Sequence, residues 1–260
     1  MNGTVYFIGT AGSGKTALVN AYNQFLHDNS VDSLTVNLDP AVVTLPYNPD
    51  IDVRDYVSMK ALLNVEPLGP NGAIMAAMDL AATELPKISD AIRDADPEYV
   101  LVDTPGQLEL FVFRAAGPVI VDSMTAGRKI SCFLMDPLLV DEAASLASLL
   151  LFSASSSLRL GIEALNVLSK ADIAPPGTVE RIAGYIEDPE SFYTLLTKRS
   201  GLVNALAAKI VEAALETTNY AEPIPVSSVE SSGLDELHAA VQRAFTGGEV
   251  EEPGGARETE

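Results

Sequence analysis

The sequence predicts a three-layer α/β fold, in which helices cover both faces of a mainly parallel sheet and helical insertions extend the layers. Segments with the patterns of strands and helices alternate along most of the chain, as they do where helices connect parallel strands. Several strand-like segments, such as residues 99–102, are continuous apolar runs, which are typical of strands covered on both faces. Hydrophobic residues make up 47% of the 260 residues, which is enough for a large core.

Each element is predicted from its local pattern. Apolar, β-branched or aromatic runs predict strands at residues 4–8, 33–38, 99–102, 130–135, 162–168 and 223–226. Helices are predicted at residues 17–26, 73–80, 85–95, 111–124, 141–158 and 234–245, with an interruption near Gly117-Pro118. Residues 45–55 are expected to form a loop with a short helical turn, and residues 69–72 a tight turn.

These elements are expected to form one domain over residues 1–246. A mostly helical stretch near residues 179–214 follows the break at Pro175-Pro176, and we interpret it as an insertion of two or three helices. Gly, Pro and Glu dominate residues 247–260. This composition cannot bury enough apolar surface to fold, so it predicts an acidic, disordered tail.

The charge of the chain excludes some classes of partner. A formal net charge of −20, from 16 basic and 36 acidic residues, repels nucleic acid and anionic membranes. The acidity would also suit a salt-rich cytoplasm, which the sequence alone does not establish. The single cysteine, Cys132, excludes an intramolecular disulfide and a cysteine-based zinc site. With no signal-peptide pattern and no membrane-spanning run, we expect a cytoplasmic protein without direct nucleic-acid or membrane partners.

Residues 9–16 match the phosphate-binding pattern G-x-x-x-x-G-K-[ST], and they lie between the first strand and the first helix. The backbone around Gly12, Ser13 and Gly14 is expected to wrap a phosphate, with the N–H groups of the helix start aimed at it. Lys15 would reach the β- and γ-phosphates, and the Thr16 hydroxyl would bind Mg²⁺. The sequence therefore predicts a P-loop nucleotide site.

Acidic residues end two neighbouring strands on the side where α/β sheets bind ligands. Asp103 follows residues 99–102, and an acid facing a P-loop holds Mg²⁺ directly or through water. Gly106 can turn its N–H toward a γ-phosphate, although a strand that simply ends in a turn gives the same pattern. Asp39 ends the second strand, where it would deprotonate water or help to hold the metal. Alternatively, Asp39 and Pro40 only end the strand.

Ser169-Lys170-Ala171-Asp172 directly follows a strand and resembles the base-recognition motif N-K-x-D, with Ser169 in place of Asn. The Asp172 carboxylate can accept both N1–H and the 2-amino group of guanine, a donor pair that adenine lacks. The Lys170 stem can cover the face of the base. Ser227 lies where a backbone N–H would meet the guanine oxygen. An ordinary exposed loop is the alternative.

Together these residues resemble the GPN-loop GTPases over residues 9–245. The most specific match is Gly69-Pro70-Asn71, the tripeptide that names the family, placed between Asp39 and Asp103. The other matching segments are Asn37-Leu38-Asp39-Pro40-Ala41, Pro46-Tyr47, and residues 50–55 and 103–109.

The resemblance implies a GTPase that uses GTP, GDP and Mg²⁺ and acts as a homodimer. It implies that Asp39 is the general base and that Gln107 and Glu109 help to position the attacking water. It also implies that Asn71 reaches the partner's γ-phosphate, and that the client is related to RNA polymerase. With Lys15, Thr16 and Asp103, these residues supply charge neutralisation and an in-line water, the main needs of phosphoryl transfer.

Three alternatives remain at this stage. The chain could be a scaffold or assembly factor whose nucleotide state switches partner binding with negligible turnover. It could be a P-loop ATPase or a small-molecule kinase, although its arginines are scattered rather than gathered in a lid. Asn71 could be a plain helix N-cap rather than a site residue.

Overall fold

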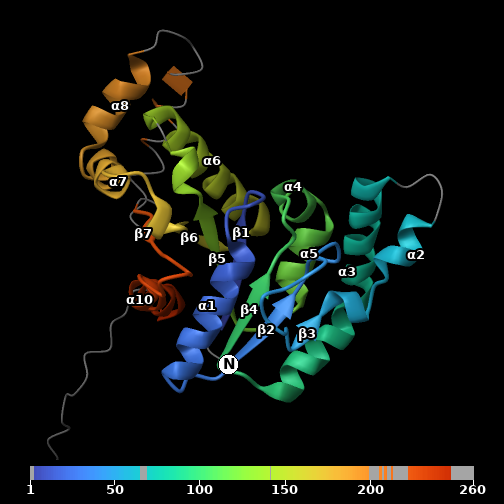
Figure 1. Cartoon of the computed structure of the whole chain (residues 1–260). Helices are drawn as coiled ribbons and strands as arrows, with labels where there is room; N and C mark the ends of the chain where they lie inside the picture. Colours follow the sequence, from blue (N-terminus) through green and yellow to red (C-terminus); the bar gives the residue numbers. More distant parts are fainter. Residues whose placement is uncertain are drawn as a thin grey trace, which may run out of the picture.

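Figure 1 shows the computed structural model, which describes residues 3–64, 69–140, 142–198, 205–206, 208–209, 212 and 222–246. At its centre lies a seven-stranded sheet with the order β3-β2-β4-β1-β5-β6-β7, and every pair of neighbours is parallel. The strands are β1 (Gly3–Gly9), β2 (Ser33–Asn37), β3 (Ile51–Asp52), β4 (Tyr99–Asp103), β5 (Arg128–Met135), β6 (Glu163–Leu168) and β7 (Ile224–Pro225). The carboxyl ends of the strands therefore share one edge, where the predicted site residues lie.

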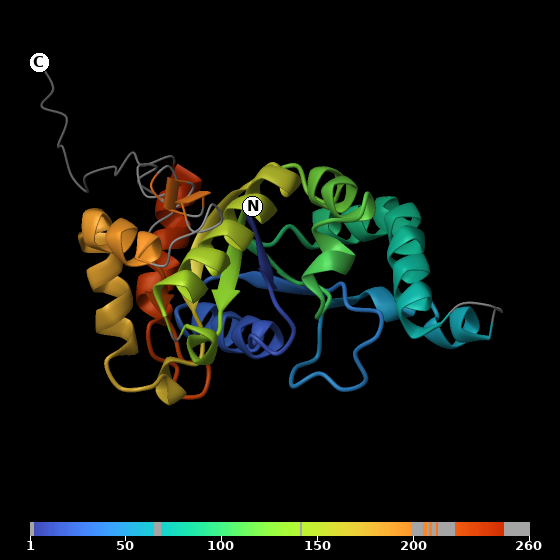
Figure 2. The ribbon, with the colours of Figure 1, turned by 90° about the horizontal axis from the view of Figure 1, so that it is seen from above.

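Helices cover both faces of this sheet, which confirms the predicted three-layer α/β fold (Figure 2). Residues of β1 alternate between two apolar clusters. Val5 and Phe7 pack with α1 (Lys15–Asp28) and α10 (Leu234–Thr246). Tyr6 and Ile8 pack on the opposite face. That face is covered by α3 (Pro70–Ala95), α4 (Leu108–Phe111), α5 (Ala116–Ser123), α6 (Ala143–Leu160), α7 (Thr178–Glu187) and α8 (Pro189–Thr197).

The helix α3 corrects the prediction of two helices at residues 73–80 and 85–95. It runs unbroken over 26 residues, although Pro86 lies inside it and removes one hydrogen bond of the helix. Pro86 is exposed. Buried side chains continue past it at helical spacing: Ala73, Ala77, Met78, Ala81, Leu85, Ile88 and Ile92. Burial of this stripe offsets the loss at the proline, and local propensity misses that contribution.

The predicted interruption near Gly117-Pro118 lies instead at residues 112–115, between α4 and α5. Gly117 and Pro118 belong to the first turn of α5, where a proline is tolerated because its missing N–H has no partner in the helix. A Cβ at Gly117 would lie 1.9 Å from the carbonyl oxygen of Phe111. The close packing of α5 on α4 therefore requires glycine at this position.

Smaller differences concern the edges of the sheet. β3, with the 3-10 turn Val53–Asp55, lies in the segment predicted as loop and helical turn, and α2 (Met59–Leu63) was not predicted. α7 and α8 occupy the first half of the predicted insertion at residues 179–214. Most of its second half and the predicted tail at residues 247–260 lie outside the described residues.

One helix of the described chain, α6, is long and apolar enough to cross a membrane by length and composition alone. Half of the residues in that window are buried inside the fold. Leu146, Leu149 and Leu150 join the cluster on the sheet, so the apolar character of α6 has a structural explanation.

Candidate functional site

The loop between β1 and α1 has the backbone conformation that a phosphate cradle requires. Gly12 and Gly14 have φ angles of 78° and 90°, in the left-handed region that glycine adopts readily. Gly14 precedes α1 as its N-cap residue and provides no side-chain cap. The first N–H groups of α1 are therefore left for an anion at the helix N-terminus.

Lys15 links this loop to the segment that follows β4. Its ammonium donates to the carbonyl oxygens of Gly9 and Thr10, both at 2.9 Å, and of Gly106 at 3.2 Å. Lys15 is only 5% exposed, and this burial lowers its pKa, although the carboxylates of Asp103 and Asp39 act in the opposite direction. A buried cation held mainly by neutral carbonyls gains from an added anion. Lys15 therefore has the position and the charge to bind phosphate.

Asp103 lies at the end of β4, next to β1, and is almost fully buried. Burial raises its pKa to about 6, although the Thr16 hydroxyl and the Lys15 ammonium act to lower it. Its Oδ2 accepts from the Tyr47 hydroxyl at 3.4 Å, whereas Oδ1 is buried without a hydrogen-bond partner among the described residues. An unpaired buried carboxylate oxygen close to a threonine hydroxyl suits a hard cation with oxygen ligands.

This donor set fits Mg²⁺ bound together with a nucleotide. The described residues contain no group of three His, Cys, Asp or Glu side chains able to hold a metal without help. Mg²⁺ seldom needs such a group, because it is commonly held by one or two carboxylates, substrate phosphates and water. Thr16 and Asp103 are the residues that would hold it.

We expect Asp103→Asn to stabilise the chain in EDTA at pH 7.5 and to weaken its binding of Mg²⁺-nucleotide. The raised pKa means that the neutral form of Asp103 stabilises the fold below pH 4, and that this contribution is lost as the pH rises through about 6. Asparagine keeps a neutral group at all pH values. We therefore expect the variant to have a free energy of unfolding roughly 2–3 kcal/mol higher than the unmodified chain above pH 6. Thermal melting and calorimetry measure the two effects. A lower melting temperature in EDTA would contradict the prediction.

Asp39 approaches the same point from β2. Its Oδ2 accepts from the N–H of Gly106 at 3.2 Å, and its Oδ1 accepts from the N–H of Ala41 at 2.9 Å. Gly106 is thus contacted on one side by Asp39, through its N–H, and on the other by Lys15, through its carbonyl. Asp39 is half-buried, so water can still reach it. The start of α1 and the loops that follow β2 and β4 therefore converge on the place expected for a γ-phosphate.

A polar network that the sequence did not reveal supports Asp39. The Asn37 side chain accepts from the N–H of Asp39 at 3.0 Å and donates to Asp52 Oδ1 at 3.0 Å. Asp52 also pairs with Arg54, whose Nε lies 2.9 and 3.0 Å from the two carboxylate oxygens. Arg54 looked like one of several scattered arginines, and no local pattern relates Asp52 on β3 to Asn37 on β2. The parallel pairing of these two strands brings them together.

The predicted base-recognition loop follows β6. Asp172 is exposed, and its Oδ1 accepts from the hydroxyl of the buried Ser227 at 2.7 Å. The Ser169 hydroxyl lies 2.7 Å from the Ser13 carbonyl oxygen and 3.1 Å from that of Met135. The residue that departs from the usual motif therefore connects this loop to the P-loop. Ser227 contributes its side chain, whereas the sequence suggested only a backbone role for that position.

Three of the predicted catalytic residues have exposed side chains. Gln107 precedes α4 and Glu109 lies in its first turn, and both side chains are exposed. Asn71 is the second residue of α3 and is also exposed. Figures 1 and 2 show the start of α3 beside α2, to one side of the P-loop. The N-cap residue of α3 is Gly69, so the interpretation of Asn71 as a plain N-cap is wrong.

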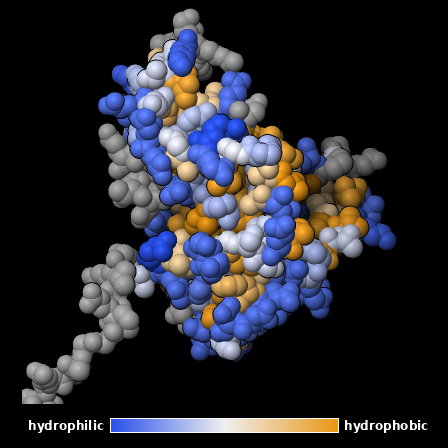
Figure 3. All heavy atoms as spheres, turned by 60° about the vertical axis from the view of Figure 1, so that its left-hand side comes forward, coloured by the Kyte–Doolittle hydropathy of each residue, from blue (hydrophilic) through white to orange (hydrophobic). Residues whose placement is uncertain are grey.

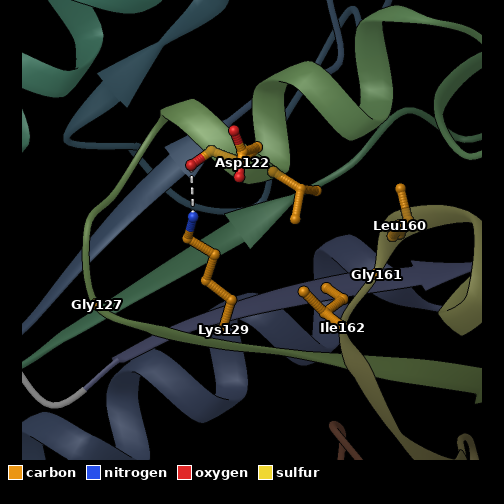
Figure 4. Close-up of a pocket in the computed structure, with 7 residues that line it drawn as sticks. Asp122, Gly127, Lys129, Leu160, Gly161 and Ile162 are labelled. Carbon is orange, nitrogen blue, oxygen red and sulfur yellow. Dashed lines mark hydrogen bonds between the residues drawn. The ribbon is translucent and has the colours of Figure 1, made fainter.

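A cavity of about 300 Å³ lies at the opposite edge of the sheet (Figure 4). It is formed near the start of β5 and the ends of α5 and α6, where Lys129 donates to the carbonyl oxygen of Asp122 at 2.6 Å. None of the predicted site residues lines it. The edge of the sheet that carries the P-loop is the candidate site, because the residues expected to bind phosphate, metal and base lie there.

Comparison with known proteins shows what the chain is similar to. A family model described as "Conserved hypothetical ATP binding protein" matches residues 7–247. A GPN-loop GTPase of Pyrococcus abyssi is 31% identical over 235 residues, which cover 90% of this chain and 93% of the relative. GPN-loop GTPase 1 of Dictyostelium discoideum is 30% identical over 90% of this chain, which spans 59% of that relative.

The crystal structure of the Pyrococcus abyssi protein, described as a GTPase in apo form, superposes with a TM-score of 0.83 at 29% sequence identity. The match covers 94% of this chain and 98% of that one. Sequence and fold thus agree over nearly the whole chain. The protein therefore belongs to the GPN-loop GTPase family.

Proposed function

We propose that this chain is a Mg²⁺-dependent enzyme that hydrolyses GTP to GDP and phosphate. The observation that carries the proposal is the position of Gly106 between Lys15 and Asp39. Lys15 contacts its carbonyl at 3.2 Å, and Asp39 contacts its N–H at 3.2 Å. A phosphate-binding cation and a carboxylate able to act on water are thus brought to one peptide group. Positioning and charge neutralisation are what this reaction mainly requires.

Each group of residues has a separate role in the proposed hydrolysis. The P-loop N–H groups and Lys15 bind the phosphates and withdraw negative charge from them. When bound, Mg²⁺ supplies further charge neutralisation, and Thr16 and Asp103 are the residues that would hold it. Asp39 accepts the proton of the attacking water, and Gln107 and Glu109 help to orient that water. Gly106 offers its N–H to the γ-phosphate once Asp39 releases it.

The guanine preference is proposed to rest on Asp172. We expect Asp172→Asn to weaken GTP binding roughly 10- to 100-fold, the scale of one or two charge-assisted hydrogen bonds. The variant should gain affinity for xanthosine triphosphate, because an amide offers a donor where the carboxylate offers only acceptors. Isothermal titration with both nucleotides measures the exchange. Asp28→Asn, an exposed acid at the end of α1, is the matched control. Full GTP affinity without any gain for the xanthine nucleotide would contradict the role of Asp172.

We further propose a homodimer in which Gly69-Pro70-Asn71, at the start of α3 of one chain, completes the site of the other. The place of Asn71 supports this, because it is exposed in the first turn of α3, and Figure 1 shows the start of α3 to one side of the P-loop. A nucleotide-switched assembly factor is the cellular role that we favour. Its client would be a protein in the cytoplasm, and the family resemblance suggests one related to RNA polymerase. The face in Figure 3 shows small apolar patches among hydrophilic side chains, on which a protein partner could bind.

A P-loop ATPase is the second candidate, because the matching family model is described by ATP binding. Calorimetric titration with GTP and with ATP, each with and without Mg²⁺, separates the two. Tighter binding of ATP than of GTP would reject the guanine assignment. A scaffold with negligible turnover is tested by single-turnover rates. A GTP hydrolysis rate no higher than that of a Lys15→Ala variant would reject the enzymatic role.

A further inference from the structure

Lys170, in the base-recognition loop, has a backbone conformation that is uncommon for its residue type. Its φ angle of 53° places it in the left-handed region. A non-glycine residue in that region carries some strain and is held there by its surroundings. In this conformation the Lys170 side chain contacts the P-loop and Asp136.

The side chain runs back across the P-loop. A Cβ built on Gly14 would lie 3.7 Å from Cε and 3.9 Å from Cγ of Lys170, so the lysine stem lies beside the last glycine of the cradle. Its ammonium reaches Asp136 at the end of β5 and lies 2.7 Å from Oδ2. The other carboxylate oxygen of Asp136 accepts from the N–H of Leu138 at 3.0 Å, which fixes the orientation of the carboxylate. Asp136 is only 13% exposed, so this ion pair is sheltered from solvent.

We propose that Asp136 is a positioning residue for purine recognition. It anchors the Lys170 ammonium, so that the lysine stem stays beside Gly14 and presents an apolar face to the ring of the base. Asp172 then binds the edge of a base whose plane is fixed by the Lys170 stem. Without Asp136, the free ammonium would return to solvent, and the stem would lose its fixed place. This inference rests on the proposed function, because it takes the ligand to be a purine nucleotide.

The test separates base binding from phosphate binding. Two ligands are titrated by calorimetry in the presence of Mg²⁺: GDP, and inorganic triphosphate, which engages the P-loop but carries no base. Asp136→Asn should weaken GDP binding about five- to tenfold, the scale of one charge-assisted contact. It should leave the affinity for triphosphate within twofold of that of the unmodified chain. A loss of P-loop structure would weaken both ligands equally, and that result would overturn the proposal.

A double-mutant cycle tests whether Asp136 acts through Lys170. Lys170→Met keeps an apolar stem and removes the charge, and it changes a partly exposed residue, so the variant should fold. Asp136→Asn should have almost no further effect on GDP affinity in the Lys170→Met background. Asp136→Glu should restore part of the affinity. If Asp136→Asn weakened GDP binding equally in both backgrounds, the positioning role would be rejected.

Asp90→Asn is the matched control, because it removes an ion pair of the same 2.7 Å length, with Arg93, on the exposed surface of α3. It should change neither affinity. If the unmodified chain binds no purine nucleotide, the proposed function and this inference fail together. If the chain binds GDP but Asp136→Asn binds it equally well, only the inference fails.

Discussion

Asp39→Ala is expected to lower the rate of GTP hydrolysis about 100-fold or more, the usual scale for a positioned general base. The affinity for GTP should change little, because Lys15 and the P-loop carry phosphate binding. Asp39 is placed for this task by two backbone N–H groups, those of Gly106 and Ala41, and by the side chain of Asn37. Single-turnover hydrolysis by enzyme in excess over GTP, together with calorimetry, measures the two quantities. Turnover close to that of the unmodified chain would exclude the base role.

Asp39 also orders the loop around Gly106, so a second variant has to separate the two roles. Asp39→Asn keeps one oxygen that can accept from the N–H of Gly106, but its amide nitrogen can neither accept from the N–H of Ala41 nor take a proton from water. We therefore expect Asp39→Asn to melt slightly below the unmodified chain, by less than Asp39→Ala, and to lose turnover as severely as Asp39→Ala. Full activity of Asp39→Asn would mean that the residue only holds the loop.

Mixing two inactive variants, Asn71→Ala and Lys15→Ala, is expected to restore activity. Asn71→Ala retains a sound P-loop, and in a mixed dimer it receives Asn71 from the Lys15→Ala partner. Each mixed dimer then has one complete site. Random mixing in equal amounts gives about a quarter of the sites complete, because half of the dimers are mixed. Failure to recover any activity, with mixed dimers shown to form by mass spectrometry, would exclude action across the dimer.

Asn71 does not cap its own helix, so the mixing experiment does not have to separate its role across the dimer from a role as a helix cap. Gly69 is the N-cap residue, and its carbonyl accepts from the N–H of Ala73 at 2.9 Å. Asn71→Ala should therefore leave melting almost unchanged, whereas loss of a true cap would cost about 1 kcal/mol. Asn64→Ala, at the exposed end of α2, is the matched control and should affect neither melting nor turnover. GTPase activity per chain should also rise with protein concentration through the range in which the dimer dissociates.

The fold and the phosphate loop were predictable, because both depend on local patterns. The apolar runs of β1, β4 and β5 mark strands that are buried on both faces, and residues 9–16 carry their phosphate-binding geometry within eight consecutive positions. The carboxyl ends of parallel strands meet at one edge, so Asp39, Asp103 and the loop after β6 could be assigned to the same side of the sheet before their contacts were known.

Only the tertiary structure decided how these residues are held. The unbroken helix α3 depends on buried contacts that offset Pro86, and helix propensity does not include them. The pair of Asp136 and Lys170 joins residues 34 positions apart, and the bond from Gly106 to Asp39 spans 67 positions. Such contacts form when the strands pair in a particular register and bury their polar ends together. The sequence alone shows which chemical groups each residue carries. Long-range packing decides which other residues those groups contact.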